Sequence, residues 1–237
     1  MGKSTKLIAV ITADVIGSSG YSTDERRSLD RILRAAFRDT EQRFPSAIHT
    51  SMAFRVTAGD EFQCVIADVP QVLRVLTYLR TVAASGGLNP PVRFRASIGI
   101  GSLSTPKRSN PYEEDGIAFV RARRGLEQLE KSRSPTRRTA LISGDEAIDT
   151  SADAVLCLAD YIMQGWTVPQ WEAVRWALLG LKRKEMARKL KIAHQNVTKR
   201  ILAAGWLQID IAFTSLAKLL PGTAGTHPKV QRRLAPK

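Results

Sequence analysis

The sequence predicts an α+β domain followed by an all-α domain, and three observations lead to this fold class. Over the first 145 residues, short apolar runs rich in Ile and Val alternate with amphipathic segments in the order β-α-β-β-α-β, then α-β. This order is typical of a ferredoxin-like, mainly antiparallel sheet. From residue 146 to about residue 204 the apolar spacing is helical. We therefore expect the α+β domain at 1–145, a helical connector at 146–166, the all-α domain at 167–220 and a disordered basic tail at 221–237.

The elements of the α+β domain follow from apolar periodicity and from residues that start or stop helices. Residues 6–13 form a short apolar run typical of a buried strand. Asp24 or Thr23 can cap a helix over 25–44, which Pro45 ends. The other predicted elements are hairpin strands at 51–57 and 61–67, a helix at 70–84, a strand at 92–101, a polar loop at 102–114, a helix at 116–131 and a strand at 139–143.

The all-α domain is predicted to contain three short helices at 170–179, 183–190 and 194–204. Pro169 suits the first turn of the first helix, and a tight turn at 191–193 joins the other two. Two short helices joined in this way are typical of a helix-turn-helix. Its expected core comprises Ile192, Val197, Ile201, Leu202 and the four tryptophans Trp166, Trp171, Trp176 and Trp206.

Charge points to a polyanionic partner. The net charge is +14, and residues 151–237 carry 14 Lys and Arg against 5 Asp and Glu. A basic surface of this density favours nucleic acid, the alternative being a solubilising face. Two cysteines are too few for a disulfide framework or a zinc site, and no apolar run approaches the length of a membrane span. We expect a cytoplasmic protein with no membrane partner.

Two carboxylates lie at a predicted hairpin tip, and a third ends the first strand. Asp60 and Glu61 follow Gly59, which permits the reversal, and Asp14 follows the first apolar run. If the first strand neighbours the hairpin, Asp14 and Asp60 lie within reach of one Mg²⁺ or Mn²⁺ ion. Glu61 is expected on the opposite face unless the turn re-aims it. The alternative is an ordinary polar turn with no ligand.

The loop after the first strand can contact phosphate. The main-chain groups of Val15, Ile16, Gly17 and Ser18 precede a polar helix start, and glycine permits close approach. By itself this pattern is short and common.

Four motifs in order resemble the SatD family: 11–19 (ITADVIGSS), 59–63 (GDEFQ), 97–101 (SIGIG) and 115–123 (DGIAFVRAR). The hairpin is similar to that of GGDEF diguanylate cyclases, and the Asp14 loop to the metal loop of class III nucleotide cyclases. The resemblance implies a cyclase-like or polymerase-like palm domain over about residues 6–132. It also implies a two-metal catalytic site on Asp14 and Asp60, with Glu61 beside them.

One position departs from the cyclase pattern. Class III cyclases place an Asn and an Arg on the helix after the fourth strand, and these positions fall on Val120 and Arg124. Valine cannot donate a hydrogen bond to a developing oxyanion. The resemblance implies that Arg124 is a catalytic residue, and Arg121 or Arg124 can still contact a triphosphate, although both also suit a solvated helix face.

The second helix of the predicted helix-turn-helix carries outward polar residues that suit DNA. Gln and Asn pair with adenine, and Lys and Arg with guanine or phosphate. The segment resembles the promoter-reading region of sigma factors and response regulators, and a three-helix docking module is the alternative. The residues expected to contact DNA are Lys182, Arg183, His194, Gln195, Asn196, Lys199 and Arg200.

These patterns predict a DNA-binding transcriptional regulator whose palm domain binds a nucleoside triphosphate or a cyclic nucleotide with a divalent metal. The alternative is an active nucleotide cyclase or nucleotidyltransferase localised to DNA. A third possibility is a metal-free palm that acts as a dimerisation scaffold. Cyclase-like palms usually pair, so the resemblance implies a homodimer.

Overall fold

The computed structural model describes residues 7–103 and 116–222. Residues 104–114 of the predicted loop, Asp115 and most of the predicted tail at 221–237 fall outside these ranges, and Ser102, predicted in that loop, is the last residue of the strand Phe94–Ser102. The described elements are β1 (Leu7–Val15), α1 (Thr23–Arg43), β2 (Arg55–Ala58), β3 (Glu61–Ile66), α2 (Val72–Ala84), β4 (Phe94–Ser102), α3 (Ile117–Lys131), β5 (Thr139–Ile142), α4 (Glu146–Gln164), α5 (Val168–Leu178), α6 (Arg183–Leu190), α7 (His194–Ala203) and α8 (Trp206–Ala217), with one-turn 3₁₀ helices at Ser18–Gly20 and Val69–Gln71.

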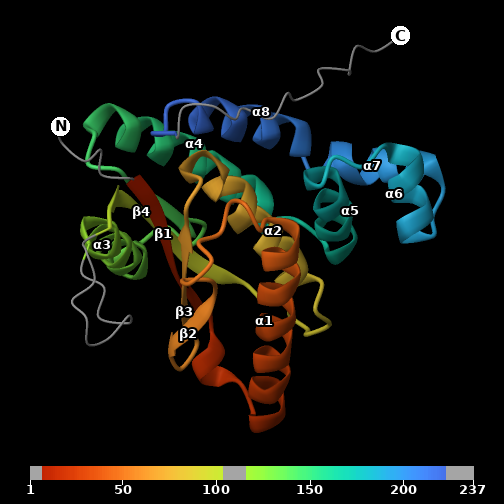
Figure 1. Cartoon of the computed structure of the whole chain (residues 1–237). Helices are drawn as coiled ribbons and strands as arrows, with labels where there is room; N and C mark the ends of the chain where they lie inside the picture. The colour runs from red at the N-terminus through yellow and green to blue at the C-terminus, as the bar shows by residue number, and fades with distance from the viewer. Residues whose placement is uncertain (1–6, 104–115, 223–237) are drawn as a thin grey trace.

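The sheet has the predicted order of elements and the strand order β2-β3-β1-β4-β5. β1 lies at the centre and pairs antiparallel with both β3 and β4, and β5 adds parallel to β4 after the α3 crossover. Figure 1 shows α1 and α2 on one face of the sheet and α3 on the other. The α+β arrangement predicted from the sequence is therefore present, followed by a helical region.

Successive side chains of β1 point to opposite faces of the sheet and therefore pack in two different hydrophobic cores. Ala9, Ile11 and Ala13 face α1 and α2 in the larger core. Ile8 and Val10 face α3 in a smaller core with Ala118 and Ala122. Asp14 has the parity of Ile8 and Val10, so it lies on the α3 face.

The start of α1 and the presence of α8 differ from the prediction. α1 is capped by Ser22 instead of Asp24 or Thr23: Ser22 Oγ accepts from Glu25 N, and Glu25 accepts from Ser22 N at 2.8 Å. This reciprocal pair satisfies two amide groups at once, which a cap one residue later would not do. α8 has no predicted counterpart; its buried Trp206, Ile209 and Phe213 have helical spacing.

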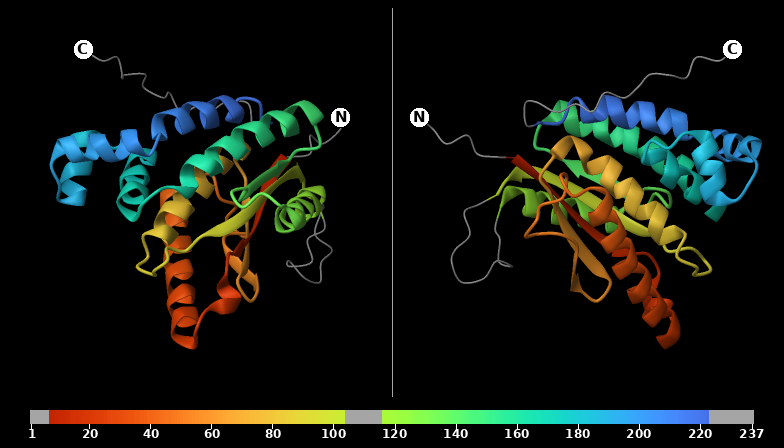
Figure 2. Two further views of the ribbon diagram at one scale, coloured as in Figure 1. Left: turned by 180° about the vertical axis from the view of Figure 1, so that it is seen from behind. Right: turned by 45° about the vertical axis from the view of Figure 1, so that its right-hand side comes forward.

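The helical region packs directly on the α+β part. Figures 1 and 2 show α8 beside α4, and α5 to α7 grouped at one end of the molecule. One continuous hydrophobic cluster runs from the sheet through α4 to α5, α7 and α8. Trp166, Trp171 and Trp206 are buried in it as predicted, whereas Leu202 is 58% exposed and not in the expected core. Leu202 directly follows buried Ile201, which places it on the outer side of α7.

A buried ion pair ties α2 to α4 and β5. Arg80 Nη1 lies 3.6 Å from Asp160 Oδ1 and 2.7 Å from Thr139 Oγ1. Asp160 Oδ2 accepts from the main-chain N–H groups of Arg138 and Thr139, at 2.7 Å each. Burial lowers the pKa of Arg80, and Asp160 opposes that effect. The packing of α2, α4 and β5 against one another thus depends on one desolvated charge pair.

The described residues include no helix that is both long and apolar enough to cross a membrane.

Replacing Asp160 by alanine leaves Arg80 buried without its counter-charge. We expect Asp160→Ala to lower the free energy of unfolding by about 3–5 kcal/mol. Asp30→Ala, which removes half of the exposed Arg34–Asp30 pair on α1, is the matched control and costs about 0.5 kcal/mol. Urea denaturation measures both values, and equal losses would contradict the role given to the buried pair.

Candidate functional site

Three polar side chains lie in one row across the sheet. The register pairs Asp14 of β1 with Glu61 of β3 on one side and with Arg95 of β4 on the other. Residues opposite one another in antiparallel strands project from the same face. Glu61 is therefore a direct neighbour of Asp14 on the α3 face, and the expectation that it would need re-aiming is wrong. The reason is that Asp60 lies in the turn, so Glu61 is the first residue of β3.

Asp14 is held by Arg95 through two hydrogen bonds. Arg95 Nε lies 3.1 Å from Asp14 Oδ1, and Nη2 lies 2.5 Å from Oδ2. The hydrogen bond to Asp14 raises the pKa of Arg95, and the charges of Glu130 and Asp60 act in the same direction. Asp60 is thus close enough to Arg95 to interact electrostatically, and the guanidinium lies among carboxylates at this end of the sheet.

The hairpin tip contacts the loop after β1. Gly59 has a φ of +59°, which fits the left-handed turn that glycine favours. Ser18 Oγ donates to Asp60, so the tip is joined to the segment at 15–18. Within that segment the Ile16 amide donates to the Arg93 carbonyl at 2.9 Å, and Val15 is buried. Of the residues predicted to contact phosphate, Gly17 is exposed and Ser18 half-buried.

Helix α3 crosses this face at short range because β4 and α3 have glycines where they meet. A Cβ at Gly99 would collide with the main chain of Ala118 and Ala122. The last turns of α3 lie toward Arg95, since Gly125 packs on Ser97 and Glu130 interacts with Arg95. The close approach places basic residues of α3 near the row Glu61–Asp14–Arg95, called the carboxylate row below.

The arginines of α3 take different directions. Arg123 lies 3.5 Å from Glu61, which also accepts a 3.1 Å hydrogen bond from Thr57 Oγ1. Arg121 donates to the Ile100 carbonyl at 2.6 Å, five residues along β4 from Arg95, and is not brought to Asp14. Arg124 and Val120 are exposed. The sequence analysis did not assign Arg95 or Arg123 to the site. The alternation of polar and apolar residues in β4 could have marked Arg95 as a residue on the polar face. The sequence does not show, however, that the strand register places Arg95 opposite Asp14.

The carboxylates of this cluster can supply only part of the ligand shell of a cation. Asp14, Asp60 and Glu61 outnumber Arg95 and Arg123, and the partner of Asp60 is a neutral hydroxyl. Within residues 7–103 and 116–222, no three His, Cys, Asp or Glu side chains are arranged to hold a metal ion. Mg²⁺ commonly takes one or two protein carboxylates and completes its shell with phosphate and water. Binding by Asp14 and Asp60 stays a prediction.

A second group of candidate residues lies on α6 and α7. Between residues 182 and 203 there are eight Lys and Arg and one Glu. Val197 and Ile201 are buried, and a three-residue turn with Lys191 in the left-handed conformation joins the two helices. Arg200 lies 3.6 Å from Glu172, and Arg183 is half-buried. The exposed predicted residues are Lys182, His194, Gln195, Asn196 and Lys199.

The sequence profile of the SatD family matches the chain at residues 7–218. A search of curated proteins gave no significant match. The solved GGEEF domain of a diguanylate cyclase from Vibrio cholerae is similar with a TM-score of 0.40 and 13% identity, covering 60% of this chain and 85% of that chain. A bacterial light-regulated adenylyl cyclase gives 0.34 and 11% over 57% and 42% of the two chains. A regulator of polyketide synthase expression from Bifidobacterium adolescentis gives 0.26 and 13% over 92% and 86%.

Removing Arg95 is expected to release Asp14 for a cation. Arg95→Met takes one positive charge from beside Asp14 and Asp60, so Mn²⁺ binding strengthens by at least about tenfold. Isothermal titration calorimetry measures the affinity. Arg34→Met, on the exposed face of α1, removes the same charge elsewhere and leaves Mn²⁺ binding unchanged. Weaker Mn²⁺ binding in Arg95→Met would show that Arg95 does not compete with a cation.

Proposed function

The chain belongs to the SatD family, and from this premise we propose that it is a DNA-binding regulator whose sheet domain binds a nucleotide. The observation that carries the proposal is the row Glu61–Asp14–Arg95 beside the glycine-containing loop, in the same chain as a basic helix pair. The row provides charged groups for a ligand, and the helix pair provides a surface for a polyanion.

The nucleotide's phosphates suit the arginines of the row. Guanidinium groups bind phosphate through paired N–H donors, and Arg95 already presents two of these donors to Asp14. Arg123 lies across the row at Glu61. Ser18 adds a hydroxyl from the adjoining loop. A ligand phosphate can therefore exchange with a carboxylate as the partner of each arginine.

We place Mg²⁺ or Mn²⁺ with the nucleotide. Asp14 and Asp60 are the residues that would hold the ion, which would neutralise phosphate charge. Asp60 suits this role because its partner, Ser18, carries no charge. Asp14 has to share its oxygens with Arg95, so this chain's own guanidinium competes for that position.

Sensing is favoured over catalysis by two features. Val120 lies where the cyclase pattern has an Asn, and its side chain is 58% exposed and apolar. It therefore supplies no donor to a reacting oxygen. Asp14, the carboxylate that would assist chemistry, is engaged by Arg95 in both oxygens.

The DNA surface is proposed on α6 and α7 arranged as a helix-turn-helix. Exposed His194, Gln195 and Asn196 form the first turn of α7, the part of a recognition helix that meets base edges. Lys182 and Lys199 are exposed beside them and suit phosphate contacts. Buried Val197 and Ile201 orient the helix so that these polar residues point outward.

Asp60→Asn tests the nucleotide site. With Mn²⁺ present we expect the wild-type chain to bind a nucleoside triphosphate and to return it chemically unchanged. Asp60→Asn weakens that binding by at least about tenfold because it removes a metal-ligating charge. Equilibrium dialysis with each triphosphate, followed by chromatography of the nucleotide, measures both properties.

Asp30→Asn on α1 is the control for charge and leaves nucleotide binding unchanged. Unaltered affinity in Asp60→Asn would remove Asp60 from the site. If the wild-type chain forms a new nucleotide product and Asp60→Asn does not, the protein is an active enzyme and the sensor proposal is wrong.

Lys199→Ala tests the DNA surface in the full chain. Loss of one phosphate contact weakens binding to random-sequence duplex and lowers the slope of log K against log salt by about one. Fluorescence anisotropy over a salt series measures both. Lys218→Ala, an exposed lysine after α8, is the matched control and changes neither. If the two variants behave alike, the contact is diffuse and α7 is not the DNA-binding element.

A further inference from the structure

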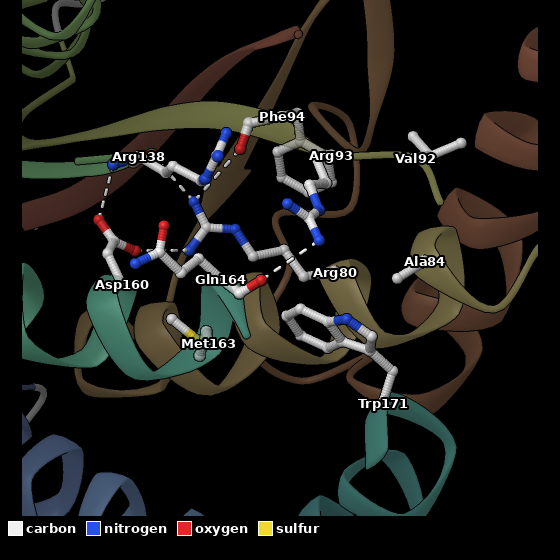
Figure 3. Close-up of a pocket in the computed structure, with 10 residues that line it drawn as sticks. All are labelled: Arg80, Ala84, Val92, Arg93, Phe94, Arg138, Asp160, Met163, Gln164 and Trp171. Carbon is white, nitrogen blue, oxygen red and sulfur yellow. Dashed lines mark hydrogen bonds and ion pairs between the residues drawn. The ribbon is translucent and has the colours of Figure 1, made fainter. Parts of the chain in front are cut away.

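A pocket separate from the carboxylate row lies where the sheet meets the helical region. Its walls come from α2, the start of β4, the residue before β5, the end of α4 and the start of α5. Figure 3 shows Arg80, Arg93 and Arg138 around this space, with Met163 and Trp171 on the helical side. The cavity volume is about 30 Å³, which is room for about two water-sized atoms.

The charges of this pocket do not balance. Three arginines line it with one carboxylate, Asp160. Asp160 is 2% exposed, and its oxygens are occupied by Arg138 N, Thr139 N, Thr139 Oγ1 and the nearby Arg80. Its one negative charge acts on both Arg80 and Arg138, so the three arginines exceed the one carboxylate of the pocket by two charges.

One donor group of Arg138 has no hydrogen-bond acceptor. Its Nε is buried and has no hydrogen-bond partner among the described residues. Burial lowers the pKa of Arg138, the positive charges of Arg93 and Arg95 lower it further, and the negative charge of Asp160 acts in the opposite direction. Arg93 donates one hydrogen bond, at 3.2 Å, to the Gln164 carbonyl at the end of α4. Two guanidinium groups therefore repel each other beside a small open space.

We propose that this pocket binds a phosphate group, with Arg93 and Arg138 as its ligands. Two positive charges match the two negative charges of a phosphate dianion, and guanidinium groups bind phosphate oxygens through paired donors. A cavity for two water-sized atoms takes two oxygens and leaves the rest of the group at the mouth. The ligand is inorganic phosphate or the phosphate of a phosphomonoester.

The position of the pocket gives the ligand a structural consequence. Arg93 and Arg138 directly precede the strands β4 and β5, whereas Gln164 and Trp171 belong to α4 and α5. A bound phosphate removes the repulsion at this junction and strengthens the attachment of the helical region to the sheet. The proposal does not depend on nucleotide binding at Asp14 and Asp60.

Calorimetric titration of the full chain with inorganic phosphate tests the proposal. We expect one saturable site with a sub-millimolar dissociation constant. At one hundred times that constant the melting temperature rises by about 5–10 °C. Arg138→Met and Arg93→Met each weaken binding at least tenfold, and Arg27→Met, 78% exposed on α1, leaves it unchanged. Absence of saturable binding, or equal losses in all three variants, would overturn the proposal.

The melting temperature in phosphate-free buffer shows whether Arg138 binds phosphate or only stabilises the fold. In phosphate-free buffer Arg138→Met raises the melting temperature, because a half-buried and repelled charge is gone, and it abolishes the further rise on adding phosphate. A merely structural Arg138 would instead give a lower melting temperature in both buffers, which would overturn the proposal. Arg138→Lys keeps the charge without the paired donors and gives intermediate affinity.

Two further arms distinguish the source of the phosphate. Tighter binding of adenosine monophosphate than of inorganic phosphate, lost in Arg138→Met, identifies a phosphomonoester. Equal affinities lost together in Arg138→Met identify the inorganic ion. Asp60→Asn retains phosphate binding in either case; loss in Asp60→Asn with retention in Arg138→Met would assign the phosphate to the carboxylate row and overturn the pocket.

Discussion

The register of β1 against β3 and β4 is the constraint on which the candidate site depends. β1 is the central strand, and its pairing places Glu61, Asp14 and Arg95 opposite one another. A slip by one residue would move the whole polar row to the other face and bury it among α1 and α2. The apolar side chains of Ala9, Ile11 and Ala13, which fill that face, hold the register.

The same constraint explains why α3 belongs to the site. Gly99 and Gly125 allow the helix to lie close to β4, and the approach brings Arg123 to Glu61 and Glu130 near Arg95. The carboxylates of the hairpin and the first strand thus have protein partners, two of them arginines. A ligand at this place enters an existing charge network, which favours exchange of phosphate for carboxylate over binding to vacant groups.

The helical region extends the core of the sheet domain. Arg80 and Asp160 join α2, β5 and α4 in a desolvated pair, and Trp171 of α5 packs beside them. Trp166 donates from Nε1 to the Ala204 carbonyl at 2.7 Å, so the end of α7 is held as well. The junction and the helices that carry the proposed DNA contacts therefore share one packed core.

The sequence by itself determined the order of the elements from β1 to α7, because apolar periodicity and helix-stopping residues such as Pro45 act locally. From that order it predicted that Asp14 and the hairpin tip lie close together, and its basic helix pair predicted a polyanionic partner. The spacing of Trp206, Ile209 and Phe213 could have revealed α8. Only the tertiary structure decided that Arg95 holds Asp14, that Glu61 lies on the α3 face and that Arg93 and Arg138 share a pocket. Such contacts join residues distant in the chain, and strand register and burial set them.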